Sequence, residues 1–171
     1  MRPTTPASPS PSRSRSSPVP NKVWLDSSRG GRGADAQGDR LVRLAGRFFR
    51  TLKLTNVELS LSLVSDDEIR ELNALWRKKN KATDVLSFPA GDMPGPGRRP
   101  LGDVVISIDT ARRAAKDFGS TLSDELDLYL AHGLLHLLGH DHHTKAAARE
   151  MEALEKQLLK RPSMLSRSDE L

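Results

Sequence analysis

All five histidines of the chain lie within one twelve-residue stretch, HGLLHLLGHDHH, residues 132–143. His132 and His136 are four residues apart, so in a helix they lie one above the other on the same side. The leucines around them indicate that this helix is buried. Gly139 stands where a helix would end in a left-handed turn, and such a turn would bring His142 back toward the first two histidines. The spacing therefore predicts that three imidazoles converge on one metal ion.

The spacing of the three histidines is that of a known class of metal site. It is H-x3-H-x5-H with a glycine at the eighth position, the frame of zinc proteases with the pattern H-E-x-x-H-x-x-G-x-x-H. Three protein ligands leave a fourth coordination position open, which is typical of a catalytic zinc site. The chain has no cysteine, so no thiolate can contribute. We predict a zincin-like metal helix in which His132, His136 and His142 hold one metal ion.

An alternative interpretation is a cluster of surface histidines, or core histidines satisfied by hydrogen bonds. We disfavour it because imidazoles in a leucine-rich helix need polar partners. His140 and His143 do not fit the ligand frame, and we expect them to contact solvent or to support the ligands. Asp141 is a candidate for orienting a ligand histidine, as carboxylates commonly do beside metal sites.

The second position of the zinc-protease pattern differs in this chain. A metalloprotease needs glutamate there as general base, whereas this sequence has Gly133. Glycine inside a helix costs about 1 kcal/mol relative to alanine. We interpret Gly133 as leaving space for a bulky substrate to approach the metal. The substitution disfavours peptide hydrolysis of the familiar kind.

Hydrophobic periodicity predicts the elements that position these residues. The expected strands are 23–26, 57–64, 83–89 and 101–109. Helices are expected from residue 39 to about 52, from 66 to about 76 after an N-cap at Ser65, and over 109–117, 123–138 and 144–159, with Ser123 as the N-cap of the metal helix. This order predicts an α/β chain of the α+β type, in which one small mixed β-sheet is packed by helices.

Composition divides the chain into three parts. We predict a disordered Pro/Ser/Arg-rich extension over residues 1–22, one domain over 23–160 and a flexible tail over 161–171. The net charge is +5, from 27 basic and 22 acidic residues. Four of the basic residues lie in the extension, which has no acid, so the remainder is nearly neutral and an RNA site would have to be a local basic patch. No apolar run approaches the roughly 20 residues of a membrane span, so we expect a soluble cytoplasmic protein with no membrane partner.

The sequence resembles the YbeY-type endoribonucleases, a family of rRNA maturation factors. Their signature is H-G-x-L-H-L-x-G-Y-D-H, and residues 132–142 read HGLLHLLGHDH, with His140 in place of the tyrosine. LNALWRKKNKATDVLSFP (72–89), LGDVVIS (101–107) and MEALE (151–155) are similar to three further blocks of that family. The resemblance covers roughly residues 55 to 158.

The resemblance implies both a function and a set of site residues. It implies a zinc ion on His132, His136 and His142, an essential arginine at Arg77 and an important acid at Asp103. The implied activity is single-strand-specific RNA cleavage, in maturation of the 3′ end of 16S ribosomal RNA and in ribosome quality control. The implied partners are ribosomal RNA and the small ribosomal subunit, with ribosomal proteins or an assembly GTPase as further candidates.

The chemistry of phosphodiester hydrolysis fits this residue set. Negative charge develops on the phosphate oxygens, so a metal ion and a guanidinium are a suitable pair. Arg77 begins a basic run with Lys78, Lys79 and Lys81, and Arg98 and Arg99 could extend it into a phosphate-binding patch; alternatively, the lysines are a solvated helix end.

The roles of two other residues stay open at this point. Trp76 could stack on a base, although we favour a core anchor. For Asp103 the sequence does not rank a general base, a partner of a metal ligand or an anchor for Arg77. Two other functions also remain, a zinc hydrolase of another substrate class and a non-catalytic ribosome-assembly factor.

Overall fold

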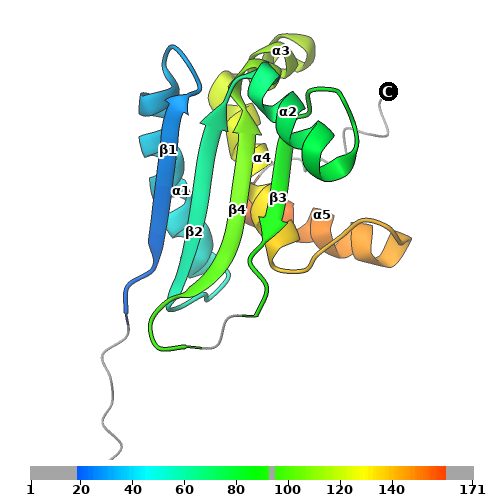
Figure 1. Ribbon diagram of the computed structural model, residues 1–171. Coiled ribbons are helices and arrows are strands. Elements are labelled where there is room, and N and C mark those ends of the chain that lie inside the picture. Colours follow the sequence, from blue (N-terminus) through cyan, green and yellow to red (C-terminus); the bar gives the residue numbers. More distant parts are fainter. Residues whose placement is uncertain (1–18, 93–94, 161–171) are drawn as a thin grey trace, which may run out of the picture.

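Four strands form one mixed sheet at the centre of the structure (Figure 1). The computed structural model describes residues 19–92 and 95–160. The strand order is β1-β2-β4-β3, with β1, β2 and β4 parallel and β3 antiparallel to β4. This confirms the predicted mixed sheet. The strands are β1 (Lys22–Arg29), β2 (Val57–Val64), β3 (Val85–Pro89) and β4 (Arg99–Ser107).

Helices cover the two faces of the sheet unequally (Figure 1). Helices α1 (Ala34–Thr51) and α4 (Leu122–Leu137) pack against one face, α1 behind β1 and α4 behind β3 and β4. Helix α2 (Asp66–Arg77) covers β3 and β4 on the other face. The last helix packs against the outside of the metal helix. The remaining helices are α3 (Ile108–Phe118) and this last helix, α5 (Lys145–Leu159).

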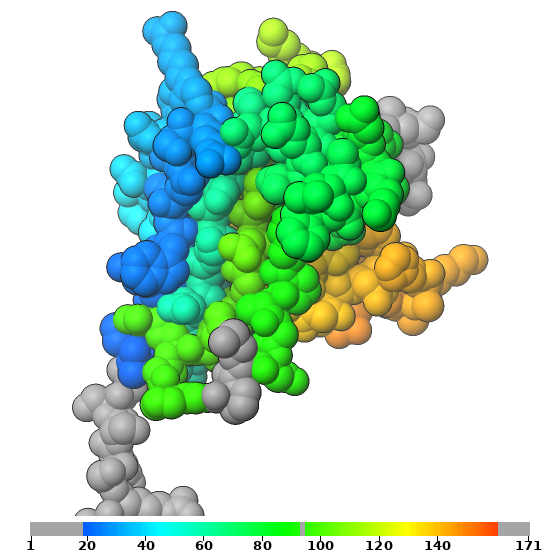
Figure 2. All heavy atoms as spheres, in the orientation of Figure 1, coloured from blue at the N-terminus to red at the C-terminus, as the bar shows by residue number. Residues whose placement is uncertain are grey.

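Strand β2 shows why the main core lies on the α1 and α4 side. Its alternate apolar side chains are at most 1% exposed, as the period-two pattern predicted: Val57, Leu59, Leu61 and Leu63. They join the apolar faces of α1 and α4 in one buried cluster. A smaller cluster lies under α2 on the opposite face, where Ile69 packs with Val64, Leu86 and Val105. Figure 2 shows that atoms of β2 and β4 remain visible between β1 and α2 on this face.

The start of one helix and the N-cap of another differ from the sequence predictions. Helix α1 begins at Ala34 rather than near residue 39, and its N-cap Gly33 has a left-handed conformation with φ 81°. The first two turns bury Ala34 and Gly38, small residues that add little to an apolar periodicity. Helix α4 is capped by Thr121 and not by Ser123, because Thr121 and Asp124 form a reciprocal capping box.

Parts of two predictions lie outside the described residues. The proposed extension, residues 1–22, is described only from residue 19, and Lys22 already belongs to β1. The proposed tail, 161–171, is not among the described residues. Within the ranges that are described, no helix combines the length and the hydrophobicity that a membrane span requires.

Gly133 lies where α4 packs closely against β3 and β4. A Cβ atom at this position would lie 2.8 Å from Val104 Cγ1 and 3.1 Å from both Ser87 Oγ and Val85 Cγ2. The hydroxyl of Ser87 also donates a hydrogen bond to the Gly133 carbonyl at 3.0 Å. The interpretation that Gly133 leaves room for substrate is therefore wrong. The glycine lets the helix pack directly on β3 and β4.

We predict that Gly133→Ala makes the protein less stable than Gly46→Ala by about 1–3 kcal/mol, the usual cost of overpacking a core. Both glycines lie inside helices, so both variants gain the same roughly 1 kcal/mol of helix propensity. An added Cβ at Gly46 meets nothing closer than an Arg50 side-chain nitrogen at 4.0 Å. Urea unfolding of both variants measures the difference, and equal free energies of unfolding would contradict the close packing at Gly133.

Candidate metal centre

Helix α4 carries two imidazoles through the core and then ends in a tight turn. His132 and His136 lie one turn apart near its carboxyl end. Gly139 follows with φ 92°, the left-handed conformation that the sequence predicted. The Gly139 N–H donates to the carbonyl of His136, and the His140 N–H donates to the carbonyl of Leu135, each at 3.0 Å. This pair of bonds is the Schellman motif, which reverses the chain after a helix.

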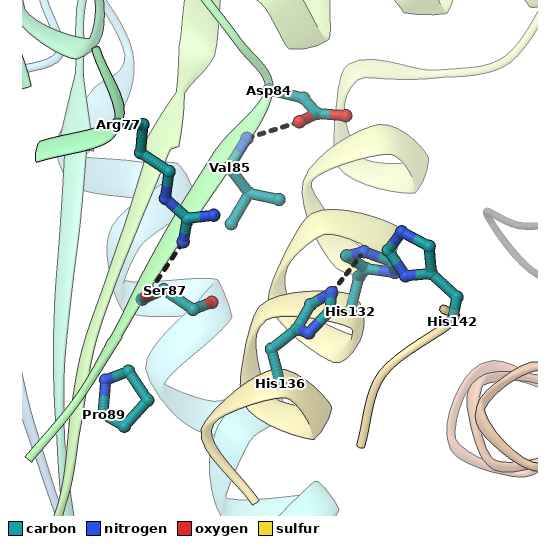
Figure 3. A pocket seen from close by; sticks show the side chains of 8 residues that line it. All are labelled: Arg77, Asp84, Val85, Ser87, Pro89, His132, His136 and His142. Atoms are coloured by element: carbon teal, nitrogen blue, oxygen red, sulfur yellow. Dashed lines mark hydrogen bonds between the residues drawn. The ribbon is translucent and has the colours of Figure 1, made fainter. Parts of the chain in front are cut away.

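The turn brings His142 back beside the two helical histidines (Figure 3). One ring nitrogen from each of His132, His136 and His142 lies within 4.8 Å of the others, close enough to hold one metal ion. The ring centroids are 4.6 Å apart for His132 and His136, and 5.4 Å apart for His136 and His142. Burial decreases along the series, from buried His132 through half-buried His136 to exposed His142. One side of the cluster is thus accessible from solvent.

The electrostatics of the cluster keep His136 uncharged. Burial is the largest cause, and the neighbouring His132, His142 and Arg77 act in the same direction. Together they lower the pKa of His136 from 6.5 to about 4. Its imidazole is therefore neutral near pH 7, which is the form that binds metal ions.

Glu155 of α5 contacts the cluster from the side of the core. Its Oε1 lies 2.5 Å from Nδ1 of His132, and the glutamate is fully buried. Asp141, the predicted orienting residue, instead accepts the backbone N–H of His143 at 3.1 Å. That prediction is wrong because Asp141 lies within the tight loop, where its carboxylate caps the local backbone. His140 faces Glu150 on α5, with 3.8 Å between Nδ1 and Oε1.

Arg77 lies across the pocket from the histidines, at the end of α2 (Figure 3). Its Nη2 donates to the Ser87 carbonyl of β3 at 3.3 Å. The chain after Arg77 is held by buried Asn73, whose side-chain amide donates to the Lys81 carbonyl at 2.9 Å. The Asn73 carbonyl accepts the backbone N–H of Lys78, which has left-handed φ of 59°. The loop is thereby fixed where it leads into β3.

One pocket joins Arg77, the three histidines and the start of β3. Asp84 lies at its rim, where its Oδ1 accepts the backbone N–H of Val85 at 2.7 Å and the hydroxyl of Thr83 at 3.2 Å. The backbone carbonyl of Asp84 also accepts the N–H of Ser107, which holds the start of β3 against the end of β4. The pocket is lined by Arg77, Asp84, Val85, Ser87, Pro89, His132, His136 and His142.

The structure does not bring Asp103 to the histidines. Side chains alternate along β4, so Val104 faces α4 and Asp103 faces the α2 side. There Asp103 lines a separate groove with Trp76 and Phe88. Trp76 is 65% exposed and meets Phe88 edge-on, with 6.1 Å between ring centroids, so its interpretation as a core anchor is wrong.

The predicted basic patch is only partly assembled. Lys78, Lys79 and Lys81 are exposed in the loop after Arg77. Arg99 begins β4 opposite Val57, and Arg98 Nε donates to the Pro20 carbonyl at 2.6 Å. Arg98 therefore lies beside the segment before β1 and Arg99 beside the start of β2, so neither extends the lysine run.

Two residues at or near the site escaped the sequence analysis. Asp84 was considered only as part of a strand, and Glu155 only as part of a helix. A signal for Glu155 exists, because it lies four residues after Met151 and thus on the buried face of α5. A glutamate on the apolar face of a helix needs a buried partner. The sequence does not identify that partner.

Comparison with known proteins relates most of the chain to one family. A family model described as Endoribonuclease YbeY matches residues 35–163. A protein named Endoribonuclease YbeY from Myxococcus xanthus is 59% identical, over 79% of this chain and 48% of its own length. Another of that name, from Anaeromyxobacter dehalogenans, is 53% identical, over 70% of this chain and 61% of its own length. The chain thus spans about half to three fifths of these two relatives.

The fold also has a counterpart among solved structures. The solution structure of a protein from Thermotoga maritima matches with a TM-score of 0.54 and 25% sequence identity. The match covers 86% of this chain and 93% of the other. The overall arrangement of sheet and helices in this chain therefore resembles that of the Thermotoga maritima protein.

We predict that the metal-free protein loses stability as the pH falls from about 6.5 toward 4. The pKa of His136 is lower in the folded protein than its ordinary value of 6.5, so the unfolded chain takes up this proton first. The stabilising contribution is present above pH 6.5 and disappears as the pH approaches 4. Urea unfolding with a chelator at several pH values measures the loss, and NMR of the His136 ring gives its midpoint.

The control for this titration is His136→Gln, which has no proton to bind at this position. Its free energy of unfolding is expected to change less over the same pH interval than that of the unaltered protein. Identical pH dependence in the two proteins, or a His136 midpoint near 6.5, would contradict the electrostatic description of the cluster.

Proposed function

Because the chain belongs to the YbeY endoribonuclease family, we propose that it is a metal-dependent endoribonuclease that cleaves single-stranded RNA. The observation that carries the proposal is one pocket in which three histidines face an arginine. His132, His136 and His142 would hold the metal ion, and Arg77 would bind the phosphate. The three histidines alone would indicate only a metal site, and Arg77 alone would indicate only a positive charge; their presence in one pocket is what favours a nuclease.

The histidine cluster fits a single zinc ion. Three imidazole nitrogens suit Zn²⁺, and the low pKa of His136 provides a neutral donor at physiological pH. When bound, the ion supplies Lewis-acid polarisation of the phosphate and activation of a water molecule. The exposed position of His142 leaves that side of the cluster open to a substrate.

Arg77 is positioned to bind a phosphate group in the same pocket. A guanidinium has five N–H donors, and the contact with the Ser87 carbonyl uses one of them. This contact holds the head group beside β3 while leaving donors for phosphate oxygens. The charge of Arg77 would stabilise the negative charge that develops during hydrolysis. The exposed lysines that follow it add attraction for a polyanionic chain.

The free edge of β3 supports a nucleic-acid substrate over a peptide. A peptide would bind beside the histidines most simply by pairing with this edge strand. The Val85 N–H is already bonded to the Asp84 carboxylate, and the Ser87 carbonyl accepts from Arg77. Pro89 has no N–H to donate. The edge is therefore poorly suited to form a ladder with a substrate backbone.

The same proposal extends to the biological role. It assigns the chain to processing of ribosomal RNA, with maturation of the 16S 3′ end and ribosome quality control as its tasks. Its partners would be the small ribosomal subunit, with ribosomal proteins or an assembly GTPase, in the cytoplasm. Family membership supports this role. Asp103 would not act on the RNA bound at the histidines, because it lies on the α2 face of the sheet.

We predict that Arg77→Ala lowers the rate of single-stranded RNA cleavage by about 100- to 1,000-fold, the usual effect of removing one group that stabilises transition-state charge. Zinc should bind at least as tightly as in the unaltered protein, because Arg77 is not among the clustered histidines and its positive charge opposes a cation there. A labelled precursor of the 16S 3′ end is the substrate, with a double-stranded RNA of the same length and a chelator as comparisons.

Arg70→Ala is the matched control, because Arg70 lies on the same helix and pairs at the surface with Asp67. Cleavage that both arginine variants retain would contradict the proposed role of Arg77. Stoichiometric zinc and RNA association without any cleavage would favour an assembly factor. Chelator-sensitive hydrolysis of a peptide instead of RNA would favour the zinc hydrolase of another substrate class.

A further inference from the structure

The carboxylate of Glu155 is buried where an ionised group needs a strong partner. Helix α5 buries only Met151 and Glu155, and the glutamate is 0% exposed. Taking a carboxylate out of water is costly unless hydrogen bonds replace the lost hydration. An apolar residue here would pack α5 on α4 without that cost. The glutamate therefore calls for an explanation beyond helix packing.

The contact of Glu155 with His132 explains why a glutamate is buried at this position. The distance between Glu155 Oε1 and His132 Nδ1 is 2.5 Å. Because an ionised carboxylate can only accept hydrogen bonds, this contact suits the tautomer of His132 that carries its proton on Nδ1. The other ring nitrogen, Nε2, is then left with a free electron pair. This Nε2 lies 3.0 Å from Nε2 of His136, on the side where the three histidines meet.

The contact also fixes where the third histidine can lie. His132 is on α4, Glu155 is on α5, and the loop between these helices carries His142. The contact between Glu155 and His132 therefore helps to hold α5 on α4, at the far end of the loop that carries His142. By contrast, the neighbouring pair of His140 and Glu150 is 3.8 Å apart, with a glutamate side chain that is 68% exposed. Such a surface pair contributes little.

We propose that Glu155 is a positioning residue for the metal centre. It sets the tautomer and ring orientation of His132, so that Nε2 faces the ion, and it couples metal affinity to the docking of α5. Carboxylates bonded to ligand histidines typically contribute 10- to 100-fold to metal affinity. The proposal rests on the metal centre of the proposed function, and it concerns zinc affinity rather than RNA cleavage.

The test compares Glu155→Gln and Glu155→Ala with Glu152→Gln in the full chain. Glu152 lies on the same helix, and its carboxylate forms an ion pair with Lys156. Zinc alone is titrated in competition with a chromophoric chelator. We expect about 10-fold weaker zinc binding for Glu155→Gln, which keeps the shape but loses the charge, and up to about 100-fold for Glu155→Ala. Glu152→Gln should bind zinc like the unaltered protein.

A second measurement separates positioning from simple loss of structure. Nitrogen NMR of the metal-free protein should show His132 protonated at Nδ1, and Glu155→Gln should weaken this preference while circular dichroism shows an intact fold. Unchanged zinc affinity and an unchanged tautomer in folded Glu155→Gln would overturn the proposal, as would failure of the unaltered protein to bind zinc. RNA cleavage that persists without metal would overturn the proposed function and leave the role of Glu155 in zinc binding standing.

Discussion

The packing of α4 directly against the sheet at Gly133 is the constraint on which the site depends. With no side chain at this position, the helix axis approaches Val104 and Ser87 closely. The approach places His132 and His136 beside the free edge of β3, the edge that Arg77 reaches from the other side. A larger residue at Gly133 would push helix and strand apart. The separation between the histidines and the arginine thus depends on how closely α4 packs against β3, the strand that holds the Arg77 head group.

The second requirement is that polar groups in a leucine-rich helix be satisfied. Helix α4 is apolar on nearly every side, so its imidazoles are costly unless they find partners. The structure supplies a carboxylate on the buried side of His132 and other imidazoles on its outer side. Because burial lowers the pKa of His136, the cluster avoids accumulating positive charge next to Arg77. Metal binding and stability of the folded protein therefore both favour the neutral form of His136.

The sheet separates two surfaces with different chemistry. On the α4 side, the pocket combines the three histidines, the Arg77 guanidinium and the edge of β3. On the α2 side, Asp103 and the exposed Trp76 line a groove next to the same strands. Adjacent residues of β4 thus serve opposite faces, because side chains alternate along a strand. Asp103, which the family resemblance implied to be an important acid, therefore lies in the groove on the α2 side, away from the histidine pocket.

The sequence by itself determined the features that depend on short-range geometry. The four-residue spacing of His132 and His136, the turn at Gly139 and the return of His142 follow from helix periodicity and from the left-handed conformation that glycine allows. The alternation in β2 and the order of elements likewise predicted a mixed sheet. Local patterns also misplaced one helix start and one N-cap, since Gly38 and Thr121 act through contacts that apolar periodicity does not record.

Only the tertiary structure decided which distant residues meet. The pairing of β3 with β4 and the end of α2 bring Arg77 to the histidines and turn Asp103 away. The docking of α5 on α4 selects Glu155, and not the nearby Asp141, as the partner of His132. The close packing of α4 on β3 and β4 that Gly133 allows depends on the side chains that the glycine faces. These outcomes depend on strand pairing and helix packing between residues far apart in the chain, which no local spacing encodes.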